Sequence, residues 1–263
     1  MGAGQADWPA LVRDPAYVVL DGLHAVKHAL RFGAVVPVLA TSDRAGTLAL
    51  AESVARDVVG RLSRDLVRLE PDELRRVFGA DPGVRVVGLA RRPEPGPASG
   101  AGPGAGPANG PLGADRTAPA VLLDTPRNLG NVGAVVRVAA GLAAGAVWST
   151  GSVDPWHRQV VRAAAGLHFA VPVARLSPDQ LAAALDTGPL VAFDRAGEDL
   201  RGIAIPDHAI LAFGSERRGL NPTLRARADA LVAIPMRQAV SSYNLATSTA
   251  IALYAWSTGA AAR

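Results

Sequence analysis

The sequence of 263 residues contains no cysteine, a single lysine and only 5% aromatic residues. The absence of cysteine excludes disulfides, thiolate metal sites and cysteine nucleophiles. No apolar run reaches the about 20 residues that cross a bilayer. The first ten residues lack the basic start and apolar core of a signal peptide. We therefore expect a cytoplasmic, soluble protein with no membrane partner.

Hydrophobic residues make up 49% of the chain, so we expect a packed core that consists mostly of Ala, Val and Leu. The net charge is +4, and every basic residue except Lys27 is an arginine. Arginine offers a planar pair of donors that suits phosphate groups, so this bias favours a nucleic-acid partner. A proteome that is generally rich in Ala, Gly and Arg would show the same bias. Charge alone does not decide between this explanation and a nucleic-acid partner.

Residues 93–119 are rich in glycine and proline and carry almost no apolar side chains. Such a segment cannot offset the entropy of ordering, so it is predicted to be a linker. It separates a first domain, residues 1–92, from a second domain, residues 120–263. Apolar runs alternate with helical patterns in both, which predicts α/β domains and, in the second, a parallel sheet covered on both faces.

The same patterns predict the elements of each domain. In the first domain, strands are expected at 17–20, 35–40, 66–69 and 84–90, and helices at 22–31, 47–60 and from 71 onward. In the second domain, strands are expected at 120–124, 145–149, 190–193, 209–213 and 231–234, and helices at 131–141, 156–165, 178–185 and 244–256.

A turn-forming segment at 125–131 follows the first strand of the second domain and opens a helix. Its proline, glycine and asparagines suit a tight turn in which Asn128 or Asn131 caps the helix. Arg137 follows among valines, where a charge is costly unless it is paired or faces a site. We interpret Arg137 as a residue of a functional site and disfavour the alternative, in which it forms a purely structural ion pair.

A second polar turn, Gly214-Ser-Glu216, follows the strand expected at 209–213. Ligands of open parallel sheets bind at the carboxyl ends of strands. Gly214 would let a ligand approach the backbone closely, and Glu216 would hold Arg137 or accept a ligand hydroxyl. A plain strand-to-helix turn explains the same residues equally well.

A third segment begins where Pro235 stops the strand expected at 231–234. We expect the backbone groups of Ile234 and Met236 to be available to an adenine edge. Serine is a common helix cap, so Ser241 or Ser242 could cap the following helix. This purely structural role is the alternative to a role at the site for both serines.

The five histidines show no metal-ligand spacing, so no metal site is expected. No Gly-x-Ser-x-Gly elbow, P-loop or Gly-x-Gly-x-x-Gly stands at a strand end. Nucleoside-triphosphatases, α/β-hydrolases and ordinary dinucleotide-binding dehydrogenases are therefore disfavoured. The three segments together indicate group transfer from a nucleotide-type cofactor that is held by backbone loops.

Residues 120–263 resemble the SpoU branch of the SPOUT superfamily, the RNA 2′-O-ribose methyltransferases. Three ordered motifs carry the resemblance, namely Asn131-Val-Gly-Ala-Val-Val-Arg137, Phe213-Gly-Ser-Glu216 with Gly219-Leu220, and Ile234-Pro-Met236 with Ser242-Tyr-Asn244. Residues 18–30 are more loosely similar to the opening of the family's substrate-binding domain.

The resemblance implies an α/β sheet with a C-terminal trefoil knot, S-adenosylmethionine as cofactor, RNA as substrate and a homodimer, without a DNA partner. It implies cofactor contacts at Gly214, Ile234, Met236 and Tyr243. It implies catalytic roles for Arg137, Glu216, Ser242, Asn244 and Asn131. Arg137 would anchor an RNA phosphate that relays the ribose proton, and Glu216 would orient Arg137. The family usually carries Leu in place of Tyr243 and Gly in place of Gln238.

Ribosomal RNA is the favoured substrate, because simple tRNA enzymes of this group often lack an N-terminal domain. A tRNA 2′-O-methyltransferase is the first alternative. A SPOUT-like protein that binds RNA without turnover is the second. A small-molecule oxidoreductase with an atypical nucleotide site is a weaker third.

Overall fold

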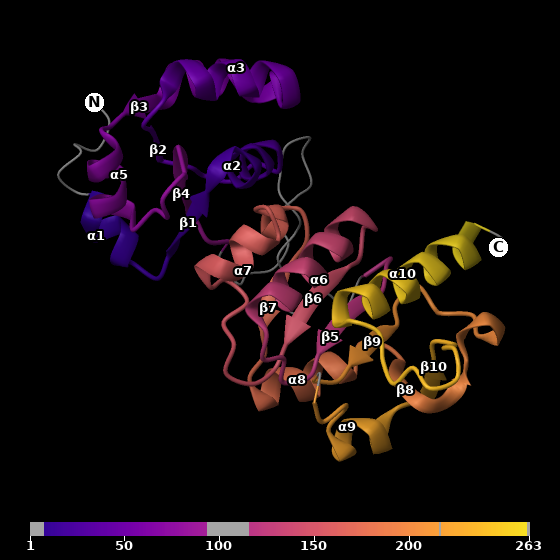
Figure 1. Ribbon diagram of the computed structural model, residues 1–263. Coiled ribbons are helices and arrows are strands. Elements are labelled where there is room, and N and C mark those ends of the chain that lie inside the picture. The colour runs from indigo at the N-terminus through magenta and orange to yellow at the C-terminus, as the bar shows by residue number, and fades with distance from the viewer. Residues whose placement is uncertain (1–7, 94–115, 216, 262–263) are drawn as a thin grey trace. The chain divides into compact units, whose positions relative to one another are not determined.

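The computed structural model describes residues 8–93, 116–215 and 217–261. These residues form two compact units (Figure 1). The first unit contains residues 8–93 with the short segment Ala165–Ala170, and the second contains residues 116–164 and 171–261. Residues 94–115, most of the expected linker, lie outside the described residues. The linker and the domain limits therefore stay predictions.

The first unit is built on a four-stranded mixed sheet with the strand order β1-β4-β2-β3. β1 (Tyr17–Asp21) and β2 (Val38–Thr41) pair antiparallel with β4 (Val86–Arg91), and β3 (Leu66–Arg68) runs parallel to β2. Five α-helices are described in this unit: α1 (Trp8–Arg13), α2 (Gly22–Arg31), α3 (Arg44–Val54), α4 (Val59–Asp65) and α5 (Pro71–Phe78). Trp8 of α1 packs on Phe78 of α5, with ring centroids 5.7 Å apart.

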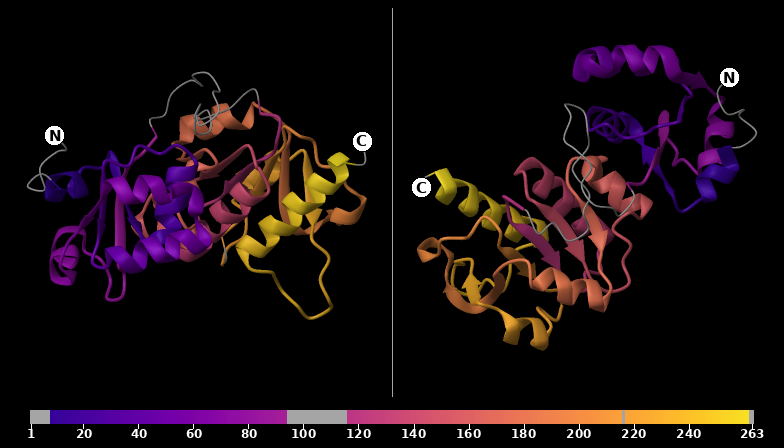
Figure 2. Two further views of the ribbon diagram at one scale, coloured as in Figure 1. Left: turned by 90° about the horizontal axis from the view of Figure 1, so that it is seen from above. Right: turned by 180° about the vertical axis from the view of Figure 1, so that it is seen from behind.

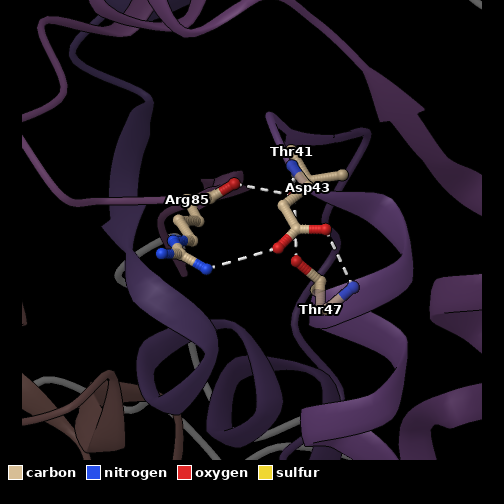
Figure 3. A network of polar contacts seen from close by, with 5 residues as sticks. Thr41, Asp43, Thr47 and Arg85 are labelled. Carbon is tan, nitrogen blue, oxygen red and sulfur yellow. Dashed lines mark hydrogen bonds and ion pairs between the residues drawn. The ribbon is translucent and has the colours of Figure 1, made fainter.

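The helix expected at 47–60 has the wrong limits. Asp43 caps α3 three residues earlier than expected, because its side chain accepts a hydrogen bond from the Gly46 amide at 2.9 Å. Figure 3 shows the contacts that tie this cap to the sheet. The Asp43 amide donates to the Thr41 hydroxyl of β2 at 3.1 Å, and that hydroxyl donates to the Arg85 carbonyl at 2.7 Å. Ala55 then leaves helical geometry, so η2 (Arg56–Val58) and the separate helix α4 follow.

The second unit contains a six-stranded sheet with the order β10-β8-β9-β5-β6-β7. Every neighbouring pair in this sheet is parallel, as the alternation of apolar runs and helices predicted. The strands are β5 (Ala120–Leu123), β6 (Ala146–Ser149), β7 (Val173–Arg175), β8 (Leu190–Asp199), β9 (Ile210–Phe213) and β10 (Ala230–Ala233).

Helices cover both faces of this sheet (Figures 1 and 2). Alternate residues of β5 show the division, because Val121 and Leu123 pack with one hydrophobic cluster and Ala120 and Leu122 with the other. The first cluster includes residues of α6 (Leu129–Gly141), α7 (Arg158–Ala163) and α10 (Leu245–Ala261). The second includes residues of α8 (Pro178–Leu185) and α9 (Pro222–Arg227).

One short strand and one short α-helix of the second unit were not predicted. β7 has three residues, too few for an alternating pattern to be legible. α9 has six residues, although Asn221 caps it and Pro222 stands at its start. In the described part of the chain, no helix has the length and apolar character needed to cross a bilayer.

Candidate functional site

β8 contains a bulge that shapes the site. Ala192 pairs with Leu231 of β10, and the next paired residue of β8 is Glu198, opposite Val232. Residues 193–197 therefore leave the ladder with β10. Gly197 stands directly before Glu198, where β8 resumes its pairing with β10. A Cβ at Gly197 would lie 2.4 Å from the Val232 nitrogen. Bulges of this kind commonly re-aim side chains beside active sites. The expected strand at 190–193 captured only the first part of β8.

A cavity of about 690 Å³ lies at the bulge of β8 and the carboxyl ends of β9 and β10. This volume is within the range of roughly 300–1,000 Å³ that is typical of small-molecule sites. Six of the predicted site residues line it, namely Gly214, Ile234, Met236, Ser242, Tyr243 and Asn244. Sequence reasoning missed the contribution of the bulge, which adds Phe193, Asp194 and Arg195. The Asp-Arg pair directly after an apolar strand was the available signal.

Gly214 is required by the chain itself. A Cβ at this position would lie 2.0 Å from the carbonyl carbon of Gly219 and 2.1 Å from the nitrogen of Leu220. Both contacts are with backbone, which cannot turn aside as a flexible side chain would. The fold itself therefore requires glycine here. Gly214 also lines the cavity, and the expected close approach of a ligand to its backbone stays a prediction.

An amide pair joins two distant segments of the chain at the cavity. Asn244 Nδ2 donates to Asn131 Oδ1 at 3.0 Å. The cap of α6 is Asn128, whose side chain accepts from the Asn131 backbone amide at 3.0 Å. The side chain of Asn131 is therefore not needed as a cap and is available to Asn244.

The helix cap of α10 is not the one expected, whereas Asn128 of α6 was one of the two expected caps. Asn244 Oδ1 accepts a hydrogen bond from the Ala246 amide at 2.9 Å, so Asn244 performs this role. The interpretation of Ser241 or Ser242 as the cap is wrong, and both exposed hydroxyl groups line the cavity instead. The Tyr243 hydroxyl donates to the Pro235 carbonyl at 3.3 Å and so closes the loop between β10 and α10.

Asp194 is the acidic side chain that the bulge places on the cavity wall. It accepts a hydrogen bond from the Ala196 amide at 2.8 Å and pairs with Arg225 Nε at 2.9 Å. The backbone hydrogen bond and then the Arg225 guanidinium hold the pKa of Asp194 below its ordinary value. Asp194 is thus a carboxylate at neutral pH.

The turn after β5 is anchored by the buried side chain of Asp124. Its Oδ2 accepts from the Asn221 amide at 2.7 Å, and its Oδ1 accepts from the Thr150 hydroxyl at 3.2 Å. Thr125 follows with a φ of 48°, a strained value for a β-branched residue. Such strain is typical of functional turns, and here it stands at the start of the turn that leads into the first motif.

Arg137 lies elsewhere on α6. The helix buries Val132, Val135, Val136 and Ala139, whereas Arg137 is exposed and does not line the cavity. The argument that its charge is embedded among apolar groups is therefore wrong, because the residue faces away from the buried stripe. Its catalytic role stays a prediction. Glu216, its expected partner, lies outside the described residues.

A parallel sheet that gathers glycine, hydroxyl and amide groups around a cavity at its carboxyl edge defines an α/β enzyme with a cofactor-sized site. In the described part of the chain, no three His, Asp or Glu side chains come close enough to hold a metal ion.

The chain is similar to known enzymes of this class. The SpoU rRNA Methylase family model matches residues 118–254. An uncharacterized tRNA/rRNA methyltransferase of Mycobacterium bovis is 30% identical over 256 residues, covering 94% of this chain and 82% of the relative. A 23S rRNA (adenosine(1067)-2′-O)-methyltransferase of Streptomyces azureus is 26% identical over 204 residues, covering 75% and 71%. The crystal structure of an AdoMet-bound rRNA methyltransferase from Sinorhizobium meliloti matches with a TM-score of 0.72 at 26% identity, covering 96% of this chain and 93% of that one.

The chain therefore belongs to the SpoU rRNA methylase family, as its three motifs indicated, and it is an RNA methyltransferase.

Proposed function

We propose that this protein transfers a methyl group from S-adenosylmethionine to a ribose 2′-hydroxyl of ribosomal RNA. The observation that carries the proposal is the Asn131–Asn244 hydrogen bond at the cavity, which joins the first and third motifs of the family. The 2′-O-methyltransferase from Streptomyces azureus supports the position of the methyl group and the choice of RNA.

The cavity fits the proposed cofactor in size and chemistry. Phe193 and Phe213 stack with their ring centroids 4.6 Å apart and give the wall an apolar part. Ile234 and Met236 stand beyond Ala233, the last residue of β10 that pairs with β8, so their backbone groups can meet a polar ring edge. With Gly214 and Tyr243 they would hold the cofactor. The AdoMet-bound relative from Sinorhizobium meliloti supports this choice.

Bound S-adenosylmethionine supplies an electrophilic methyl group. A ribose hydroxyl is a weak nucleophile, so the protein must orient it and provide for its proton. Holding two reactants in place is worth about 7–11 kcal/mol. Asn131, Ser242 and Asn244 would align the ribose through neutral hydrogen bonds. Arg137 cannot act as a base, because its guanidinium stays protonated. Its proposed role is to anchor the RNA phosphate that takes up the proton, with Glu216 orienting it.

The proposal includes a homodimer, a C-terminal trefoil knot and a cytoplasmic location. The surface of α10 supports the homodimer, because this 17-residue helix has no charged residue and Tyr254 on it is 64% exposed. Exposed aromatic side chains on uncharged surfaces are typical of protein interfaces. Light scattering should give twice the chain mass of 27.0 kDa, and a monomer at working concentration would contradict the dimer. The knot follows from the family resemblance.

The test of function is methyl transfer from labelled S-adenosylmethionine to unmodified 23S rRNA and tRNA transcripts in parallel, followed by ribose-methylation mapping. One new 2′-O-methyl site in rRNA is the expected result. Ser242→Ala should reduce transfer, whereas Ser257→Ala on α10, whose hydroxyl donates to the Tyr254 carbonyl, should not. Transfer to tRNA alone would correct the substrate. Cofactor binding without transfer to either RNA would favour the non-catalytic alternative.

A further inference from the structure

The arginines of the second unit differ in how their charge is balanced. Some of them pair with carboxylates, and examples are Arg201 with Asp199, Arg225 with Asp194 and Arg227 with Asp186. Four others, Arg127, Arg195, Arg217 and Arg237, are exposed and have no carboxylate partner among the residues that the structure describes. We call these four the edge arginines.

Three of the edge arginines occupy equivalent places in the sheet, and the fourth lies in the bulge of β8. Arg127, Arg217 and Arg237 each stand four residues beyond the end of a strand, after Leu123 of β5, Phe213 of β9 and Ala233 of β10. Arg195 stands in the bulge of β8. These four strands are consecutive in the order β10-β8-β9-β5, and all are parallel. Their carboxyl ends therefore meet at one edge, over about 14 Å at the usual strand spacing. The loop that carries Arg237 is the gold loop before α10 in Figure 2.

Charges of one sign that share an edge repel each other, and this arrangement favours a ligand that carries several negative charges. Asp194 does not neutralise Arg195 fully, because its oxygens are occupied by the Ala196 amide and by Arg225. The cofactor does not account for the set either, because it has one carboxylate and only Arg195 and Arg217 line the cavity.

We propose that the edge arginines form a phosphate track that holds the backbone of the substrate RNA across the cavity. The identity of the polyanion as RNA rests on the proposed function. The guanidinium group binds phosphate with two parallel hydrogen bonds, so the track would position the RNA strand without reading its sequence. Arg195 and Arg217 would lie nearest the reacting ribose, and Arg127 and Arg237 would hold the flanking phosphates.

The test is the salt dependence of binding to unmodified 23S rRNA transcripts, measured by filter binding with the full chain between about 50 and 200 mM salt. Each phosphate contact contributes about 0.7–0.9 to the slope of log affinity against log salt. Arg195→Ala combined with Arg237→Ala should therefore lower the slope by about 1.4–1.8. The same change should weaken binding at about 0.1 M salt by roughly 25-fold or more.

Two variants make the result specific. Arg227→Ala removes an arginine of the same unit that is paired with Asp186 before β8, and it should leave the slope unchanged. Arg195→Lys combined with Arg237→Lys keeps the charges and should retain most of the slope even if the alanine variant folds poorly. An unchanged slope in the alanine variant, or an equal loss in Arg227→Ala, would overturn the track.

Methyl transfer by the wild-type protein to the same RNA separates this proposal from the proposed function. Transfer with an unchanged slope in the alanine variant would refute the track and keep the function. A lowered slope without transfer by the wild-type protein would keep the track and refute the function.

Discussion

Replacing Asn244 separates its structural role from its role at the site. Its Oδ1 caps α10 through the Ala246 amide, and its Nδ2 donates to Asn131. Loss of a helix cap costs about 1 kcal/mol. Loss of an exposed neutral hydrogen bond costs about 0.5 kcal/mol, the low end of the usual range. Asn244→Ala should therefore lower the free energy of unfolding by about 1.5 kcal/mol, or the Tm of this unit by about 3–6 °C.

Asn244→Asp should behave differently. Aspartate caps a helix as well as asparagine does, and its charge is favourable at a helix N-terminus by about 0.3–1 kcal/mol. The variant should therefore keep most of the wild-type stability. Its side chain can no longer donate to Asn131 Oδ1, so the polarity of the pair is lost. Because small displacements at a reacting centre cost about 100-fold in rate, methyl transfer should fall by that order.

The assays are calorimetric unfolding and methyl transfer to 23S rRNA transcripts, with both Asn244 variants measured beside Asn221→Ala. Asn221 caps α9 by accepting from the Thr223 amide at 2.8 Å and does not line the cavity. Its loss should cost stability of the same order as the Asn244 cap and leave methyl transfer intact. Wild-type turnover by Asn244→Asp would refute the role of the amide pair, and wild-type stability of Asn244→Ala would refute the cap.

Three other substitutions test single features of the site. Gly214→Ala should cost about 3 kcal/mol of stability, because its Cβ would lie 2.0 Å from the Gly219 carbonyl carbon, and wild-type thermal unfolding would contradict this close approach. Arg137→Ala should keep cofactor affinity by calorimetry, because the residue does not line the cavity, and lose methyl transfer; undiminished turnover would remove Arg137 from the catalytic set. The lowered pKa of Asp194 stabilises the fold at pH values above the ordinary aspartate value of about 3.9, and this contribution is lost as pH falls through the lowered pKa. The stability difference between wild type and Asp194→Asn should therefore be full near neutral pH and shrink in acid, and a difference that is constant with pH would contradict the assignment.

The local features of this protein could be read from its sequence because they depend on neighbours in the chain. Pro178 and Ser177 define the start of α8, whose limits were predicted correctly. The apolar run at Ala120–Leu123 predicted a buried strand, and the alternation of strands and helices predicted the parallel sheet of the second unit. The three motifs predicted the family, and six of the predicted site residues line one cavity.

Only the tertiary structure decided features that depend on contacts between distant segments. The bulge of β8 exists because β10 pairs with Ala192 and then with Glu198, a register that nothing within residues 190–199 reveals. Gly214 is needed because Gly219 and Leu220 fold back onto it. Arg137 looked embedded among valines in the chain, yet its side of α6 faces outward. Local propensity specifies which elements form, whereas packing decides which side chains meet, because burial and close approach arise only when the elements assemble.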